Sequence, residues 1–187
     1  MSTKYKFWDN RKLYFVSYAV VGWIDLFTRN EYREIVADSW NFCTSQRGME
    51  IYAWVIMPSH VHMIVGTHGD PLDKLFADMK RHTSRELHKA IETHPKESRR
   101  EWLLDYMRKC GERNSNNGKF QLWRQDNHPL YVDRPGKLQK AIHYIHYNPV
   151  KSGDVSLPEH WIWSSAAQYM TGQREGRVRL EEVLVGG

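Results

Sequence analysis

The sequence has few cysteines and no long apolar run, and both absences limit the kind of protein it can encode. Two of its 187 residues are cysteines, Cys43 and Cys110, which is too few for the disulfide framework of a small secreted domain. No stretch approaches the roughly 20 apolar residues that a membrane-spanning helix needs, and the first residues lack the apolar core of a signal peptide. We therefore expect a cytoplasmic protein that makes no association with a membrane.

Interdomain linkers and internal repeats are also missing from the sequence. No segment has the combined Pro, Gly and Ser content of a linker, and the low-complexity patch "NSNNGK" at 114–119 predicts a loop. A chain of this length can bury one well-formed core. We therefore expect residues 1–187 to form a single domain with a short C-terminal tail.

Positive charge and aromatic side chains are what the sequence has in excess. Its formal net charge is +5, and it contains eight Trp and ten Tyr residues. A basic surface attracts polyanions, and flat aromatic faces can stack on unpaired bases, although most aromatic side chains in any domain belong to the core. The composition is compatible with a nucleic-acid partner but does not require one.

The spacing of apolar residues predicts alternating strands and helices. We expect strands at 13–23, 49–57 and 60–67 and at the end of 120–133, and helices at 28–48, in two parts between 71 and 110, and at 135–149. The short connection at 57–59 contains Pro58 and predicts an antiparallel hairpin, and the last helix should end at Asn148 and Pro149 because the residue before proline avoids helical angles. This order predicts an α+β fold, namely a ferredoxin-like or RRM-like antiparallel sheet with helices packed on one face and the other face open to a ligand.

Two histidines interrupt an otherwise apolar strand. His60 and His62 lie in "WVIMPSHVHMIV" (54–65), and residues two apart on a strand point to the same face, so their imidazoles could share one metal ion. A His-x-His pair also occurs by chance, and the pair could simply cover a sheet edge. A metal site should offer more than two protein groups, so a third ligand would decide between these readings.

The predicted last helix supplies a candidate third ligand and a nucleophile. Its apolar stripe leaves four polar residues along an adjacent edge: Lys137, Lys140, Tyr144 and Asn148. A divalent ion held by two imidazoles and an amide can polarise a phosphodiester, and a phenolic oxygen can attack phosphorus. A tyrosine on a helix edge is more commonly a half-buried packing residue. Tyr147 is a rival nucleophile, but its neighbour one turn later is Lys151, beyond the predicted end of the helix, so Tyr147 has no amide ligand beside it.

The middle helical region carries basic residues beside its apolar stripe. Lys80, Arg81 and Arg85 lie there, and they form either a solvated face of a core helix or a surface that follows a phosphate backbone. Lys137 and Lys140 on the last helix could extend such a surface.

The segments "WVIMPSHVHMIV" (54–65) and "YIHYNPVKSGDV" (144–155) together resemble the HUH-type single-tyrosine transposases, which are IS200-like. The resemblance is in particular to the REP-associated tyrosine transposases, whose signature includes Tyr-Ile-x-x-Asn-Pro-Val, and it extends from the first strand to about Trp163. The resemblance implies that His60 and His62 bind the metal, that Tyr144 is the nucleophile and that Asn148 is the third ligand. Insertion-sequence relatives more often have Gln at the position of Asn148.

The resemblance also implies a reaction and a set of partners. Members of the family cut single-stranded DNA hairpins, keep a covalent 5′-phosphotyrosine link and rejoin the strand when a free 3′-OH attacks it, with Mg²⁺ or Mn²⁺ as the expected ion. We expect a monomer or homodimer that acts on such hairpins. The alternatives are a catalytically silent binder of hairpin DNA or RNA and a metal-dependent hydrolase of small phosphoesters.

Overall fold

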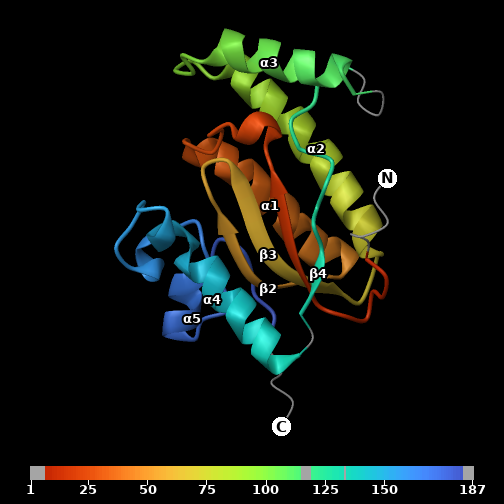
Figure 1. Ribbon diagram of the computed structural model, residues 1–187, viewed down its shortest axis with the longest axis vertical. Helices are drawn as coiled ribbons and strands as arrows, with labels where there is room; N and C mark the ends of the chain where they lie inside the picture. The colour runs from red at the N-terminus through yellow and green to blue at the C-terminus, as the bar shows by residue number, and fades with distance from the viewer. Residues whose placement is uncertain (1–6, 115–118, 133, 183–187) are drawn as a thin grey trace.

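The centre of the molecule is a four-stranded antiparallel sheet. A computed structural model describes residues 7–114, 119–132 and 134–182 (Figure 1). The sheet order is β2-β3-β1-β4, with β1 at Tyr14–Ala19, β2 at Met49–Ile56, β3 at His60–Thr67 and β4 at Leu130–Tyr131. Strands β2 and β3 form the predicted antiparallel hairpin, and β1 pairs with both β3 and β4. The predicted α+β class is confirmed.

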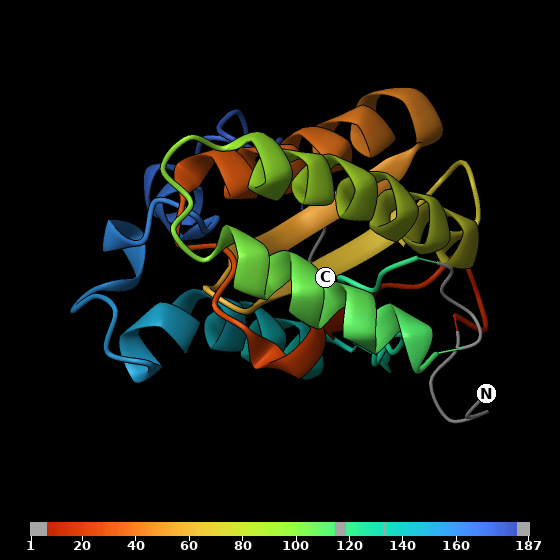
Figure 2. The ribbon, with the colours of Figure 1, turned by 90° about the horizontal axis from the view of Figure 1, so that it is seen from above.

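Helices surround this sheet. Five α-helices and two short 3₁₀ segments are described: α1 Asn30–Arg47, α2 Leu72–Thr93, α3 Arg100–Glu112, α4 Pro135–Lys151, α5 Ala166–Thr171, η1 Val21–Trp23 and η2 Pro158–His160. Figures 1 and 2 show α1 and α2 on one side of the sheet and α4 on the other. The helices therefore cover both faces, whereas we expected one.

The second covered face exists because the hairpin strands are apolar on both sides. In β3 every residue from Val61 to Gly66 is buried, and α4 lays Leu138, Ile142 and Ile145 against a small apolar cluster that includes Val55 and Ile64. A strand buried on both faces reads as a continuous apolar run without alternation. The stripe on α4 packs on the sheet as predicted, but on the face opposite to α1 and α2.

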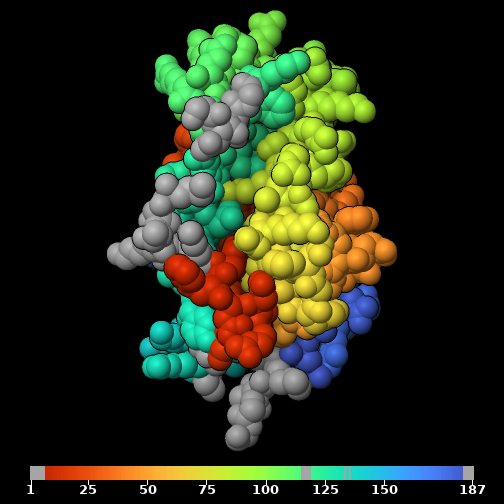
Figure 3. All heavy atoms as spheres, turned by 90° about the vertical axis from the view of Figure 1, so that its right-hand side faces the viewer, coloured from red at the N-terminus to blue at the C-terminus, as the bar shows by residue number. Residues whose placement is uncertain are grey.

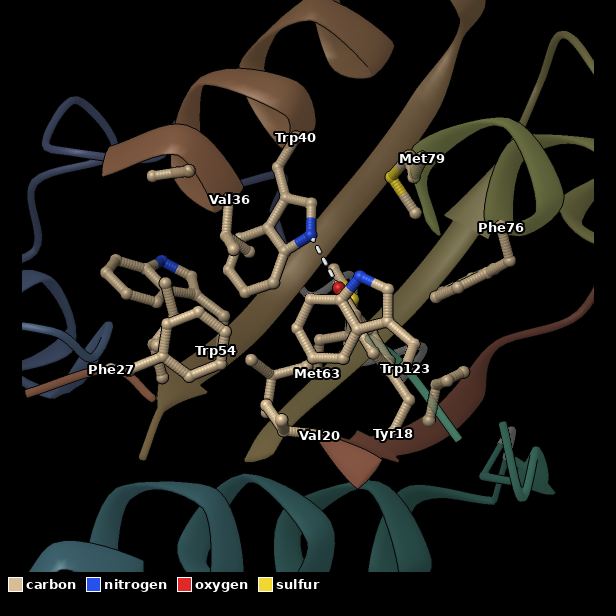
Figure 4. Packing of buried hydrophobic residues seen from close by; sticks show 14 of the residues in the cluster. Tyr18, Val20, Phe27, Val36, Trp40, Trp54, Met63, Phe76, Met79 and Trp123 are labelled. Carbon is tan, nitrogen blue, oxygen red and sulfur yellow. Dashed lines mark hydrogen bonds between the residues drawn. The ribbon is translucent and has the colours of Figure 1, made fainter. Parts of the chain in front are cut away.

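The larger core fills the space between the sheet, α1 and α2. Four alternating residues at 14–20, namely Tyr14, Val16, Tyr18 and Val20, are all buried in it. Figure 4 shows the Trp40 indole N–H donating to the Tyr18 hydroxyl, and the distance is 3.0 Å. Because burial disfavours the phenolate, the pKa of Tyr18 is raised. This bond satisfies two polar groups inside the core and ties α1 to β1.

Two predicted element ends differ from the structure. The first strand ends at Ala19, where the chain turns into η1. The last helix continues past Asn148 and Pro149 to Lys151, so the predicted end was wrong. Proline near a helix end removes one backbone hydrogen bond, and here the last carbonyls are still satisfied because Asn148 O accepts from the Ser152 N–H and Pro149 O accepts from the Asp154 N–H.

The segment after α4 packs against the outer edge of the sheet. The Ile56 N–H donates to Trp163 O, the Ser165 N–H to Trp54 O and the Glu181 N–H to Ile51 O, at 2.8, 3.0 and 2.8 Å. Residues 163–181 are thus part of the folded structure. No helix in the described ranges is both long and apolar enough to cross a membrane.

Candidate active site

The histidine pair lies at the start of β3, on the face that α4 covers. His60 pairs with Ala19 and His62 with Ser17 across β1, and the two imidazole centroids are 4.7 Å apart. His60 is partly exposed, while His62 is only 6% exposed. The strand therefore places the two rings side by side, as the spacing predicted.

The imidazole of His62 is buried. Neither Nδ1 nor Nε2 has a partner among the described residues. The pKa of His62 is lowered to about 3, mainly by burial and to a smaller extent by the neighbouring His60. Burial also lowers the pKa of His60. His60 Nδ1 lies 3.1 Å from the Ser59 hydroxyl. Both rings are therefore neutral near pH 7, which is the form that binds metal ions.

Tyr144 on α4 lies against this pair. Its ring centroid is 5.2 Å from that of His62 and 5.8 Å from that of Phe15, both in edge-on geometry. Phe15 in turn stacks on His62 at 5.3 Å. The Tyr144 ring therefore covers one side of the His62 imidazole, and because Tyr144 is 44% exposed it remains accessible to a ligand.

The rival tyrosine has different neighbours. Tyr147 is 46% exposed and stacks on His143 at 4.1 Å, and no ring contact between Tyr147 and the histidine pair is found within the described part of the chain. The helix includes Lys151, so the predicted position of Lys151 beyond the helix was wrong, but a lysine one turn after Tyr147 still offers no amide ligand. Proximity to His62 still distinguishes Tyr144 from Tyr147.

Asn148 is half-buried on the same edge of α4, one turn after Tyr144. Within residues 7–114, 119–132 and 134–182 there is no group of three or more His, Cys, Asp or Glu side chains that could hold a metal ion. An ion at the histidine pair would therefore need ligands of another kind, such as an amide oxygen. His146, a possible substitute on α4, is directed elsewhere because its Nε2 lies 2.9 Å from the Ser165 hydroxyl.

The basic residues on α2 have two different roles. The Lys80 ammonium donates to Arg124 O at 2.7 Å and to the Asn127 side chain at 2.6 Å, and burial lowers its pKa to about 7. Lys80 is therefore not the solvated cation that the sequence suggested. Arg81 and Arg85 are exposed, as are Lys137 and Lys140 on α4.

Arg81 and Arg85 line a groove whose opposite wall was not predicted. That wall is the segment from Lys119 to Gln125, which Figure 3 shows in teal beside the yellow and yellow-green of α2. The segment lies there because its backbone extends the pairing of β1, with the Arg124 N–H donating to Ala19 O at 2.8 Å. Lys119 and Arg124 thus join the α2 arginines, although only their charge could have indicated this from the sequence.

Comparison with known proteins finds one family. Residues 24–117 match the family model described as "Transposase IS200 like", a range that includes His60 and His62 but ends before Tyr144. Among solved structures, the chain is similar to a REP-associated tyrosine transposase bound to a REP hairpin, with a TM-score of 0.66 and 17% identity over 100% of this chain and 96% of that chain. At this identity the likeness establishes the fold. No curated protein matches the chain.

Proposed function

The chain belongs to the IS200-like transposase family, and we propose that it cuts and rejoins single-stranded DNA at hairpin sequences through a covalent link to Tyr144. The contact between Tyr144 and His62 carries this proposal, because it puts a solvent-accessible phenol beside a pair of neutral imidazoles. The fold shared with a transposase bound to a REP hairpin supports hairpin DNA as the substrate class.

The residues present fit a divalent metal ion. Two buried ring nitrogens without partners among the described residues are costly unless something binds them, and a neutral imidazole is a common metal ligand. His60 and His62 would hold the ion, with the Asn148 amide oxygen as third protein ligand. When bound, Mg²⁺ or Mn²⁺ would act as a Lewis acid on the scissile phosphate.

The protein residues account for the rest of the chemistry. The Tyr144 oxygen loses its proton and bonds to phosphorus, the bond from phosphorus to the 3′ oxygen breaks, and the upstream strand leaves with a free 3′-OH. A 3′-OH that later attacks the phosphotyrosine forms a new phosphodiester and releases Tyr144. The phosphoester is exchanged and never hydrolysed, so rejoining needs positioning but no nucleotide cofactor.

The packing of α4 supplies that positioning. Ile145 is fully buried beside Tyr144, and Leu138 and Ile142 are nearly so, which holds the helix against the sheet that carries the histidines. Phe15 and Tyr144 enclose the His62 ring. A site built on a packed helix and a central strand keeps its reacting groups in register.

We place the DNA backbone along two basic surfaces. One is the groove of Arg81, Arg85, Lys119 and Arg124, whose side chains can contact phosphates. The other is the exposed start of α4 with Lys137 and Lys140, on the helix that carries Tyr144. Lys80 belongs to the wall of the groove, where it holds the segment at 124–127.

We further propose that the chain acts as one domain, in the cytoplasm, as a monomer or homodimer.

A cleavage assay tests the function. Labelled single-stranded hairpins from the surrounding genome are incubated with the protein and Mn²⁺ and separated by denaturing electrophoresis. We expect a covalent protein–DNA adduct that Tyr144→Phe abolishes while hairpin binding persists. Tyr147→Phe is the matched control, since it lies on the same helix with the same exposure, and it should leave the adduct intact.

The outcomes separate the competing functions. An adduct that survives Tyr144→Phe would assign the nucleophile to another residue. Hairpin binding without any adduct would indicate a silent binder, and turnover of small phosphoesters that is independent of Tyr144 would indicate a hydrolase.

A further inference from the structure

Trp23 is an exposed aromatic residue in a conformation that costs energy. Its side chain is 52% exposed, and its φ is 55°, in the left-handed region that bulky residues rarely occupy. A residue is held there only when its surroundings determine it, and such positions cluster at functional sites. The indole gains little burial in return, so the core does not explain it.

The surroundings of Trp23 hold it in place. Gly22 has a φ of 67°, which side chains rarely adopt, and a Cβ on it would come within 2.3 Å of the Tyr106 hydroxyl oxygen, so a larger residue here would be strained and would displace the Tyr106 side chain of α3. The Val21 N–H donates to Leu122 O at 2.8 Å, and the Trp23 N–H donates to Val20 O at 3.1 Å. The turn that presents the indole is therefore anchored on both sides.

The indole lies beside the histidine pair. Its ring centroid is 5.3 Å from that of His60, and the Arg124 guanidinium carbon is 5.5 Å from the Trp23 centroid. A hollow bordered by Trp23 also contains Arg113, Gln121 and Arg124. An exposed aromatic face, flanked by cations and polar groups, is the arrangement with which proteins bind unpaired bases.

We propose that Trp23 stacks on an unpaired base of the single-stranded DNA next to the phosphodiester that reaches His60 and His62. This inference rests on the proposed function for the position of that phosphodiester. Arg124 would contact the neighbouring phosphate from the other side of the indole, and the base would be held outside the duplex beside Tyr144. Trp23 would then act as a positioning residue that sets the nucleotide at which the strand is cut.

A cycle of protein and DNA changes tests the stacking. Binding is measured without metal, by fluorescence anisotropy, on a hairpin with single-stranded flanks and on a series in which one flanking nucleotide at a time lacks its base. Trp23→Ala should weaken binding to the intact hairpin about 5- to 100-fold. One abasic position should weaken the wild type by a similar factor and have no further effect on Trp23→Ala. Trp23→Phe should recover part of the affinity.

Two variants control for the fold. Trp23→Gly removes the ring while keeping the positive φ accessible, so it should bind like Trp23→Ala even if alanine strains the turn. Trp102→Ala removes an indole with the same exposure, 53%, from α3, and should bind like the wild type.

The result that overturns the inference is additivity, in which each abasic position weakens Trp23→Ala by the same factor as the wild type. Coupling without a Tyr144 adduct would leave the inference standing while the cleavage function fails. A normal adduct without coupling would reject the inference alone, and failure of the wild type to bind any of the hairpins would reject both.

Discussion

Replacing His62 with leucine should leave the metal-free protein as stable as the wild type, to within about 0.5 kcal/mol, or more stable, while abolishing cleavage. The side chain is 6% exposed, and neither ring nitrogen has a partner among the described residues. A buried polar group without a partner costs about 1–3 kcal/mol, and a leucine of similar size removes that cost. The lost ring contacts with Phe15 and Tyr144 offset about 0.5–1.5 kcal/mol. Subtracting the second range from the first gives a net change between a loss of about 0.5 kcal/mol and a gain of about 2.5 kcal/mol, with its midpoint at a gain of about 1 kcal/mol.

Urea denaturation in EDTA measures this difference. The matched control is His146→Leu, because His146 is also buried, at 8% exposed, but its Nε2 lies 2.9 Å from the Ser165 hydroxyl. Breaking that hydrogen bond should destabilise the protein by about 1–2 kcal/mol. Mn²⁺ should then stabilise the wild type but not His62→Leu. If His62→Leu loses more than about 1 kcal/mol in EDTA, the imidazole is satisfied in the folded protein and the reasoning fails.

The same pair of proteins should differ in pH dependence. The pKa of His62 is about 3 in the folded protein, below the ordinary value of about 6.5 expected when unfolded. The unfolded state therefore takes up the proton first, and stability is lost as pH falls from about 6.5 towards 3, by at most about 1.4 kcal/mol per pH unit. His62→Leu should show a shallower loss over this window, and equal slopes in EDTA would contradict the burial of a neutral ring.

Two further predictions concern the third ligand and the basic groove. Asn148→Ala should raise the Mn²⁺ concentration needed for half-maximal cleavage by about 10- to 100-fold, and an unchanged Mn²⁺ titration would place the third ligand elsewhere. The double variant Arg81→Ala, Arg85→Ala should lower the slope of log hairpin affinity against log salt concentration by about two, at unchanged thermal stability. If this slope is unchanged, α2 has a structural role only. Lys80→Met should instead lower the free energy of unfolding by about 1.5–3 kcal/mol, because it removes the two hydrogen bonds of the Lys80 ammonium.

The sequence predicted best where local patterns decide the structure. The helix predicted at 28–48 does end at Gly48, which has a φ of 71° and a cap bond from its N–H to Cys43 O, because such a stop depends on the backbone of one residue. The hairpin and the common face of His60 and His62 follow from strand period in the same way. The contact of Tyr144 with His62 could be expected only from the joint pattern of two motifs.

Properties that depend on tertiary packing could not be predicted. Lys80 looks like its neighbours Arg81 and Arg85 in sequence, and only the position of the segment at 124–127 makes it a buried donor. The face chosen by α4 depends on how much apolar surface β2 and β3 leave uncovered. Nothing in the sequence around Trp23 indicated its role, because the strain lies in the backbone of Trp23. The side chain that packs on Gly22 is Tyr106, which comes from α3 and is distant in the sequence.

The covering of β2 by the later chain limits how two copies of this protein can associate. An outer strand with free backbone groups invites a second sheet to add to it, but at β2 those groups are already bonded to Trp163, Ser165 and Glu181. A continuous sheet running through two subunits is therefore blocked at this edge. Any homodimer would have to use side-chain surfaces or the short β4 edge. A chain cut off before Trp163 would leave the backbone groups of β2 without these partners, and we expect it to aggregate through this edge.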